Sequence, residues 1–194
     1  MERVTHSGIP GIGKVSWGDH VCHFYRTRSE MVESVVPYLV AGLKNHERCM
    51  LGAGSPFYAD DVRRELTRAV PDFEKRAGKG QITIFDHHDW YTNNPSTNPV
   101  QDLLRTEERA LADGYKGLRC GGNISWITRK DWTTWLEYEK NVSKAMKNRR
   151  ILAICSYDVT KCEGPEVFDA MRHHHFTVAK HDGDWGLFER KRRK

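Results

Sequence analysis

The sequence has no long apolar run and no secretory leader. No uninterrupted apolar stretch approaches the about 20 residues that a membrane-spanning helix needs. Residues 1–6 include no apolar core of the kind that a signal peptide carries. We therefore predict a soluble, cytoplasmic protein that does not use a membrane.

Cysteine is sparse, and its pattern excludes a disulfide scaffold. The chain has five cysteines, an odd number, and none of them form a C-x-x-C pair. In a cytoplasmic protein such thiols stay reduced and behave as small apolar side chains. They are Cys22, Cys49, Cys120, Cys155 and Cys162.

Internal repeats, low-complexity segments and long linkers are also missing. The 194 residues suit one domain. We predict an irregular N-terminal lead-in over residues 1–17, a single domain over 18–188, and a basic tail over 189–194. Residues 90–99, rich in Asn, Thr and Pro, are predicted to form a surface loop, with a lid as the alternative.

A basic surface for nucleic acid is not expected on the folded part. The net charge is +5, but residues 189–194 hold five positive charges and one negative charge, so the remaining chain is nearly neutral. Proteins that bind nucleic acid instead carry a basic stripe on a folded face. The tail is predicted to be a solvated chain end, with an electrostatic contact to an acidic partner as the alternative.

One motif resembles a phosphate-binding loop, but the residues before and after it argue against that function. Gly8, Gly13 and Lys14 fit the pattern G-x-x-x-x-G-K. Such a loop needs a strand before it and a helix after it, and its next residue is Ser or Thr. Here no strand pattern precedes the motif, strand-forming residues follow it, and Val15 occupies the hydroxyl position. We interpret the motif as unrelated to phosphate binding.

The remaining chain alternates short apolar runs with helical patterns. Strands are predicted at 21–25, 49–54, 81–85, 117–122 and 151–155, and helices at 29–43, 60–70, 100–112, 132–147 and 166–173. A final pair, 176–180 and 186–189, is predicted to be antiparallel. This alternation indicates an α/β fold with a mainly parallel central sheet, helices on both faces and a short antiparallel C-terminal edge.

Histidines and cysteines form two groups that could bind zinc or haem. His20 and Cys22 share one face of a strand, while His23 points to the other. The run His173, His174, His175 lies at a helix end. A second pair of ligands could come from Cys155 or from this run if the strand order brings them together. The competing interpretation is that the thiols pack in the core and the histidines complement the helix dipole.

Nucleophilic catalysis by a cysteine is a weaker possibility. Cys22 and Cys120 are the candidates, and Cys120 precedes two glycines at the end of a predicted strand. Neither lies in a sequence typical of cysteine hydrolases. Packing is the simpler interpretation.

Aromatic residues end or follow three predicted strands. Tyr25, Trp126 and Tyr157 could meet where the carboxyl ends of parallel strands line one edge, with Arg119, Asn123 and Asp158 orienting a ligand. Alternatively, the rings simply close the rim of the core.

An ordered series of motifs resembles the methanogen/methylotroph sensory (MEDS) domains. The segment GDHVCHFY at 18–25 is similar to the G-D-H-x-C-x-F-Y opening of that family. Further similar segments are 42–49, 114–119, 125–126, 137–139, 154–158 and 171–174. The resemblance runs from about residue 16 to 182.

The resemblance implies a RecA/KaiC-like core without a working phosphate loop. It also implies a sensory role, with small organic molecules such as hydrocarbon derivatives as ligands, and an output through DNA-binding or kinase partners. Two positions depart from the family pattern: Asn123 replaces a common acidic residue, and His175 replaces a common proline, which enlarges the histidine cluster.

These observations predict a non-enzymatic sensor that needs no cofactor and binds a small organic ligand at the carboxyl edge of the sheet. It would act through a signalling partner or as a homodimer, and its core would not bind nucleic acid. The expected binding residues are His20, Cys22, Tyr25, Arg119, Asn123, Trp126, Glu139, Cys155 and Tyr157. One alternative is a metal- or haem-binding redox or gas sensor that uses His20, Cys22, His173, His174 or His175. A degenerate nucleotide-binding enzyme, able to bind ATP, is the other.

Overall fold

The computed structural model describes residues 3–87 and 98–189. Most of the predicted loop at 90–99 and nearly all of the basic tail lie outside these residues. The helices are α1 (Arg28–Lys44), α2 (Ala59–Ala69), α3 (Phe73–Gly78), α5 (Pro99–Ala112), α6 (Trp132–Ala145) and α7 (Gly164–His173), with a 3-10 turn η1 (Arg129–Asp131). The strands are β1 (Val4–His6), β2 (Lys14–Ser16), β3 (His20–Tyr25), β4 (Arg48–Ala53), β5 (Ile82–Asp86), β6 (Leu118–Asn123), β7 (Ile151–Asp158), β8 (Phe176–His181) and β9 (Asp184–Glu189).

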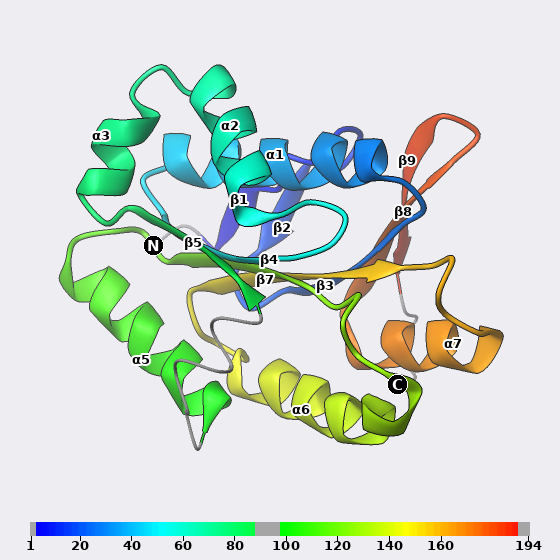
Figure 1. The fold of residues 1–194 in the computed structure, drawn as a ribbon. Coiled ribbons are helices and arrows are strands. Elements are labelled where there is room, and N and C mark those ends of the chain that lie inside the picture. The colour runs from blue at the N-terminus through cyan, green and yellow to red at the C-terminus, as the bar shows by residue number, and fades with distance from the viewer. Residues whose placement is uncertain (1–2, 88–97, 190–194) are drawn as a thin grey trace.

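Seven of these strands form the central sheet, in the order β5-β4-β6-β7-β3-β8-β9 (Figure 1). All neighbours are parallel except β8 and β9, which pair antiparallel at one edge. The predicted α/β class, with its mainly parallel sheet and antiparallel C-terminal edge, is therefore confirmed. In the centre, Cys22 of β3 lies opposite Cys155 of β7 and Thr177 of β8.

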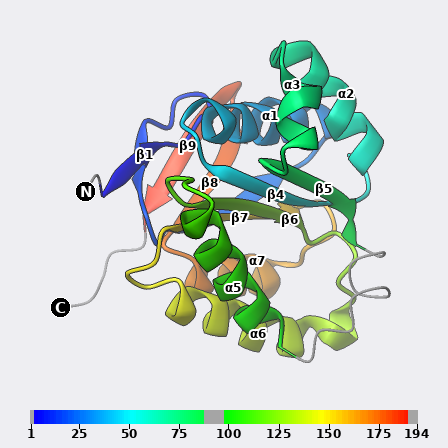
Figure 2. The same cartoon turned by 90° about the vertical axis from the view of Figure 1, so that its left-hand side faces the viewer.

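Helices cover both faces of the sheet. Helices α1, α2 and α3 lie on the face that is uppermost in Figure 1, and α5, α6 and α7 lie on the other; Figure 2 shows the same two layers from the side. We call these the upper and lower faces. Helix α1 buries Met31, Val35 and Leu39, which recur at the four-residue spacing of one helical face. Its cap is Thr27, whose side chain accepts from the Glu30 amide.

The predicted irregular lead-in is wrong in its conformation. Residues 4–6 and 14–16 pair as an antiparallel hairpin. Ile9, Ile12 and Val15 are buried in the upper core, which gives this segment an apolar anchor. Gly8 and Gly11 have positive φ values, and these allow the tight connection between the two strands.

The hairpin also confirms that the G-x-x-x-x-G-K motif is not a phosphate loop. Lys14 begins β2, and β2 is followed by β3 rather than by a helix. Where the chain does pass from a core strand to a helix, between β3 and α1, the connection is Arg26 and Thr27, without a glycine. Separately, no helix within the described residues has the length and apolar character needed to cross a bilayer.

Candidate functional site

A cavity of about 130 Å³ lies beneath the centre of the sheet, on its lower face. Its roof is formed by β4, β6 and β7, and its walls by α5 and α6. Trp126 and His87 border it toward the carboxyl ends of the strands. We predicted a site at the carboxyl edge of the sheet; this hollow lies under the strands and reaches that edge at Trp126 and His87.

Small residues on the central strands create this hollow. Cys120 and Gly122 of β6, with Ala153 and Cys155 of β7, line it. A side chain added at Gly122 would meet only the Ile124 Cδ1 atom, at 3.7 Å. Interiors are normally filled to crystal-like density, so small side chains across two adjacent strands leave space for a guest.

The walls are mainly apolar and come from both helices. Helix α6 contributes Trp135, Tyr138 and Val142, and α5 contributes Leu103. Trp126 packs edge-on against Trp135, with ring centroids 5.9 Å apart, and stacks on His87. Pockets of this composition bind molecules largely through apolar contact, while a few polar groups fix the orientation.

Polar groups gather at one end of the cavity. His20, Glu139 and Cys155 line it, and His174 lies behind them. The His20 Nε2 atom is 3.2 Å from both Glu139 Oε2 and Cys155 Sγ. Glu139 Oε2 is 3.5 Å from His174 Nε2 and 3.7 Å from the Cys155 sulfur. We call these four residues the His/Cys/Glu cluster.

The strand order explains why distant residues meet here. Strand β3 lies between β7 and β8, so His20 is flanked by Cys155 on one side and by His174, two residues before β8, on the other. Glu139 approaches from α6 below. The strand order therefore brings His20, Cys155 and the histidine run together, as a shared group of metal ligands would require.

The charges of the cluster follow from its burial. Burial lowers the pKa of His174 to about 3, helped by His20 and opposed by Glu139, so His174 is neutral near pH 7. Burial by itself would raise the pKa of Glu139. The neighbouring His174 and His20 side chains and the hydrogen bond from Tyr157 outweigh it and hold that pKa near 2. Glu139 is therefore a buried carboxylate.

Five of the nine predicted binding residues line the cavity: His20, Asn123, Trp126, Glu139 and Cys155. The Asn123 side chain is committed to the protein, because its amide donates to the Gly54 and Ser55 carbonyls and its oxygen accepts from Tyr25. Glu139, one of the expected binding residues, is the centre of the polar cluster, in contact with its three other members.

Cys22, Tyr25 and Tyr157 do not line the cavity, so the expected meeting of Tyr25, Trp126 and Tyr157 is not observed. Cys22 packs within a lower-face core with Tyr157. Tyr157 donates to Glu139 Oε1 at 2.9 Å and so acts through that carboxylate. Tyr25 belongs to the core above the sheet, because on β3 it points to the face opposite to that of Cys22.

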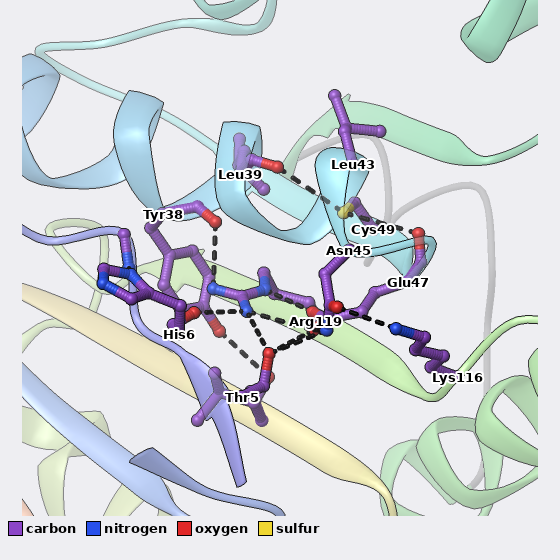
Figure 3. A network of polar contacts seen from close by, with 12 residues as sticks. Thr5, His6, Tyr38, Leu39, Leu43, Asn45, Glu47, Cys49, Lys116 and Arg119 are labelled. Atoms are coloured by element: carbon purple, nitrogen blue, oxygen red, sulfur yellow. Dashed lines mark hydrogen bonds and ion pairs between the residues drawn. The ribbon is translucent and has the colours of Figure 1, made fainter. Parts of the chain in front are cut away.

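Arg119 does not line the cavity either; its side chain lies on the upper face of the sheet, beside α1 (Figure 3). Its Nε donates to Glu47 Oε2 at 2.5 Å, and both side chains are fully buried. The rest of the guanidinium binds the carbonyls of Ser7, His6 and Tyr38. Hydrogen bonding to Glu47 raises the pKa of Arg119 despite its burial. This arginine fastens the N-terminal hairpin to the sheet and to α1.

Gly42 of α1 makes room for that arginine. A Cβ there would lie 2.6 Å from Arg119 Cδ and 2.8 Å from Cys49 Sγ. We expect Gly42→Ala to lower the free energy of unfolding by about 1–3 kcal/mol, because overpacking forces the buried pair to shift. Urea unfolding measures this loss. Gly78→Ala is the control, since a Cβ at that exposed site meets nothing within 4 Å, and equal stability of the two variants would contradict the prediction.

Of the three consecutive histidines, only His174 enters the cluster. His173 ends α7 and lies partly exposed, and His175 accepts from the His20 backbone amide through Nδ1. Sequence reasoning missed the wall residues Trp135, Tyr138 and Val142. Their signal was available, because with Glu139 they fall at i, i+3, i+4 and i+7, which places a carboxylate within an apolar helical stripe.

Comparison with known proteins supports the resemblance. The profile of the MEDS family, described as the methanogen/methylotroph, DcmR sensory domain, matches residues 19–175. The chain belongs to the MEDS family. The transcriptional repressor DcmR of Methylorubrum extorquens is 29% identical to this MEDS chain over 169 residues, covering 84% of the chain and 60% of the repressor. The chain thus spans about three fifths of that relative, and the family gives it a sensory role.

Solved structures share the fold of this MEDS chain. A KaiC-like protein of Pyrococcus horikoshii matches with a TM-score of 0.62 at 19% identity, over 97% of this chain and 89% of its own. A second P. horikoshii protein, uncharacterized and solved with an unknown peptide, matches at 0.63 and 14% identity, over 90% and 84%. The flagellar accessory protein FlaH of Methanocaldococcus jannaschii gives 0.55 at 9%, over 91% and 78%. The expected KaiC-like architecture is confirmed.

Proposed function

We propose that this MEDS chain senses a small, mainly apolar organic molecule bound in the cavity under β4, β6 and β7. The observation that carries the proposal is the cavity itself, with its apolar helical walls and the His/Cys/Glu cluster at one end. The sensory description of the family and the repressor relative support sensing in preference to catalysis.

The size of the cavity limits the ligand. An engineered apolar protein cavity of about 150 Å³ holds one benzene molecule. The present volume of about 130 Å³ therefore suits a molecule of roughly six heavy atoms or fewer. The cluster residues His20, Glu139 and Cys155 would orient a single polar group of the guest, and Trp126 and Trp135 would contact its apolar part.

Filling the cavity tests this proposal. We expect benzene, phenol or 1-pentanol to raise the melting temperature of the wild-type protein in a saturable way. Ligand at 100 times its Kd adds about 2.7 kcal/mol, which corresponds to roughly 5–10 °C for a chain of this size. Gly122→Leu should weaken binding at least about 10-fold, since its side chain projects into the hollow without a close contact.

The matched control is Gly78→Leu, on α3 above the sheet, where the added side chain meets nothing within 4 Å. It should bind each compound as the wild type does. Unliganded Gly122→Leu should melt at or above the wild-type temperature, because it fills empty space. Failure of every compound to bind the wild type, or equal binding by Gly122→Leu, would refute the proposed site.

For output, we propose that ligand binding changes a surface that another protein chain reads, either a signalling partner or a second copy. A ligand can shift such an equilibrium only by its difference in affinity for the two states. Light scattering with and without the bound compound tests the second-copy route. An unchanged mass leaves a separate partner as the reader.

A further inference from the structure

The geometry points to a zinc-binding site in the His/Cys/Glu cluster, made by His20 Nε2, His174 Nε2, Cys155 Sγ and Glu139 Oε2. These four atoms lie within 4.8 Å of one another. Two imidazoles, a thiolate and a carboxylate are ligands that Zn²⁺ accepts. This inference does not depend on whether the cavity binds an organic molecule.

The distances suit a tetrahedral ion. Zinc bonds of about 2.0–2.3 Å place neighbouring ligand atoms roughly 3.3–3.7 Å apart in a tetrahedron. Glu139 Oε2 has His20 Nε2 at 3.2 Å, His174 Nε2 at 3.5 Å and Cys155 Sγ at 3.7 Å. All four donor atoms lie within 4.8 Å of one another, a spacing that favours a single ion over the planar ring of haem.

Hydrogen bonds behind the histidines fix both rings in the form that binds a metal. His174 Nδ1 lies 2.6 Å from the Ala170 carbonyl, which can only accept, so Nδ1 carries the proton. Ser143 donates its one hydroxyl hydrogen to the His173 carbonyl and therefore accepts from His20 Nδ1 at 2.8 Å. Each Nε2 is left with a lone pair directed into the cluster. At known zinc sites, a hydrogen bond to the other ring nitrogen fixes the histidine in the same way.

One of these lone pairs has no donor. His174 is 97% buried, and its Nε2 has no hydrogen-bond partner among the described residues. Its neighbour is the Glu139 carboxylate, which is also an acceptor. Burying an unsatisfied polar atom is costly, and a cation between the two removes that cost.

The charges also balance around a divalent ion. Zinc binding displaces the Cys155 thiol proton to solvent, which leaves one thiolate and one carboxylate against the two positive charges. The second Glu139 oxygen is occupied, because Tyr157 donates to Oε1 and Trp135 in turn donates to the Tyr157 oxygen. The carboxylate therefore presents Oε2 to the ion.

The proposed ligand set overlaps the one considered from sequence. His20, His174 and Cys155 were named there as possible ligands, Glu139 is added, and Cys22, His173 and His175 are left out. Cys22 shares the lower face with His20 but packs with Phe24 and Tyr157 in the core. His173 lies partly at the surface.

Metal analysis of the untagged protein tests the site. We expect about one zinc ion per chain, removable by a chelator and restored by added Zn²⁺. Cobalt in its place should give the d–d bands of a tetrahedral site and a thiolate-to-cobalt charge-transfer band. Cys155→Ser should abolish that band and weaken Zn²⁺ binding at least about 100-fold, beyond the about 10–100-fold loss typical of outer groups. His174→Gln should weaken binding comparably and provides a second variant if Cys155→Ser fails to fold.

The matched controls are Cys22→Ser, a buried thiol opposite Cys155, and His173→Gln, the preceding histidine. Both should keep the stoichiometry and the charge-transfer band. Absence of Zn²⁺ and Co²⁺ binding by the wild type, cobalt binding without a thiolate band, or an unchanged affinity in His174→Gln would overturn the inference.

Discussion

Replacing Glu47 by alanine is expected to lower the free energy of unfolding by about 3–5 kcal/mol, although Glu47 does not line the cavity under the sheet. The loss arises because Arg119 would keep its charge in a fully buried position without its carboxylate. Thr5 and Asn45, which donate to Glu47 Oε1 at 2.6 and 2.7 Å, would also lose their acceptor. Folded domains are stable by only about 5–15 kcal/mol, so this one change removes a large part of the total.

Urea unfolding monitored by circular dichroism measures the effect, and two comparisons give it meaning. Glu137→Ala removes an exposed partner of Lys140 and should cost no more than about 1 kcal/mol. The double variant Glu47→Leu with Arg119→Met should be more stable than Glu47→Ala, because it removes both charges and leaves none buried alone. A loss below 1 kcal/mol in Glu47→Ala would show that the pair does not hold the N-terminal hairpin in place.

The architecture could be predicted from sequence because its signals are local. Runs such as 151–155 and the helical period of α1 each carry their own evidence, and the structure has β7 and α1 at these positions. The elements that the sequence did not predict, α3 and the β1–β2 hairpin, have only weak local signals. Helix α3 has only six residues and buries only Phe73, and the β1–β2 hairpin has three-residue strands. Short elements gain their stability from tertiary contacts that no local window contains.

The site depended on strand order and register, which local patterns do not specify. Phe24, not Tyr25, lies opposite Tyr157 in the β3–β7 pair, so the two tyrosines fall on opposite faces. Alternation along the strand also places Arg119. Its neighbours Leu118 and Cys120 face the lower core, while Arg119 faces Glu47 above the sheet. Neighbouring residues on a strand point to opposite faces of the sheet. A shift of one position therefore separates the predicted role of Arg119, in binding, from its observed place in an ion pair.

Acid is expected to weaken this protein through a buried histidine that lies outside the proposed site. His23 projects from β3 to the upper face and is fully buried. Ser34, whose hydroxyl donates to the Glu30 and Met31 carbonyls, lies 3.0 Å from Nε2 and accepts from it. Ser156 is 2.9 Å from Nδ1 and donates to it. The ring is thus fully bonded in its neutral form.

Burial lowers the pKa of His23 from 6.5 to about 3. Below pH 6.5 the unfolded chain gains a proton at this residue and the folded chain does not, so stability falls as the pH falls and the loss is complete near pH 3. Each pH unit in this window costs about 1.4 kcal/mol. His23 therefore lowers the free energy of unfolding by about 2 kcal/mol at pH 5 and by roughly 4–5 kcal/mol at pH 3, relative to neutral pH.

Urea unfolding of the wild type and of His23→Gln between pH 7.5 and pH 4.5 isolates this contribution. His174 and Glu139 add acid sensitivity to both proteins, so the difference between the two curves belongs to His23. His23→Gln should be less stable near pH 7 but should lose less stability on acidification, so the curves should converge by about 2 kcal/mol between pH 6.5 and pH 5. The exposed His181→Gln variant should follow the wild type. Parallel curves for wild type and His23→Gln would mean that His23 accepts its proton in the folded state, which its two serine partners and its burial oppose.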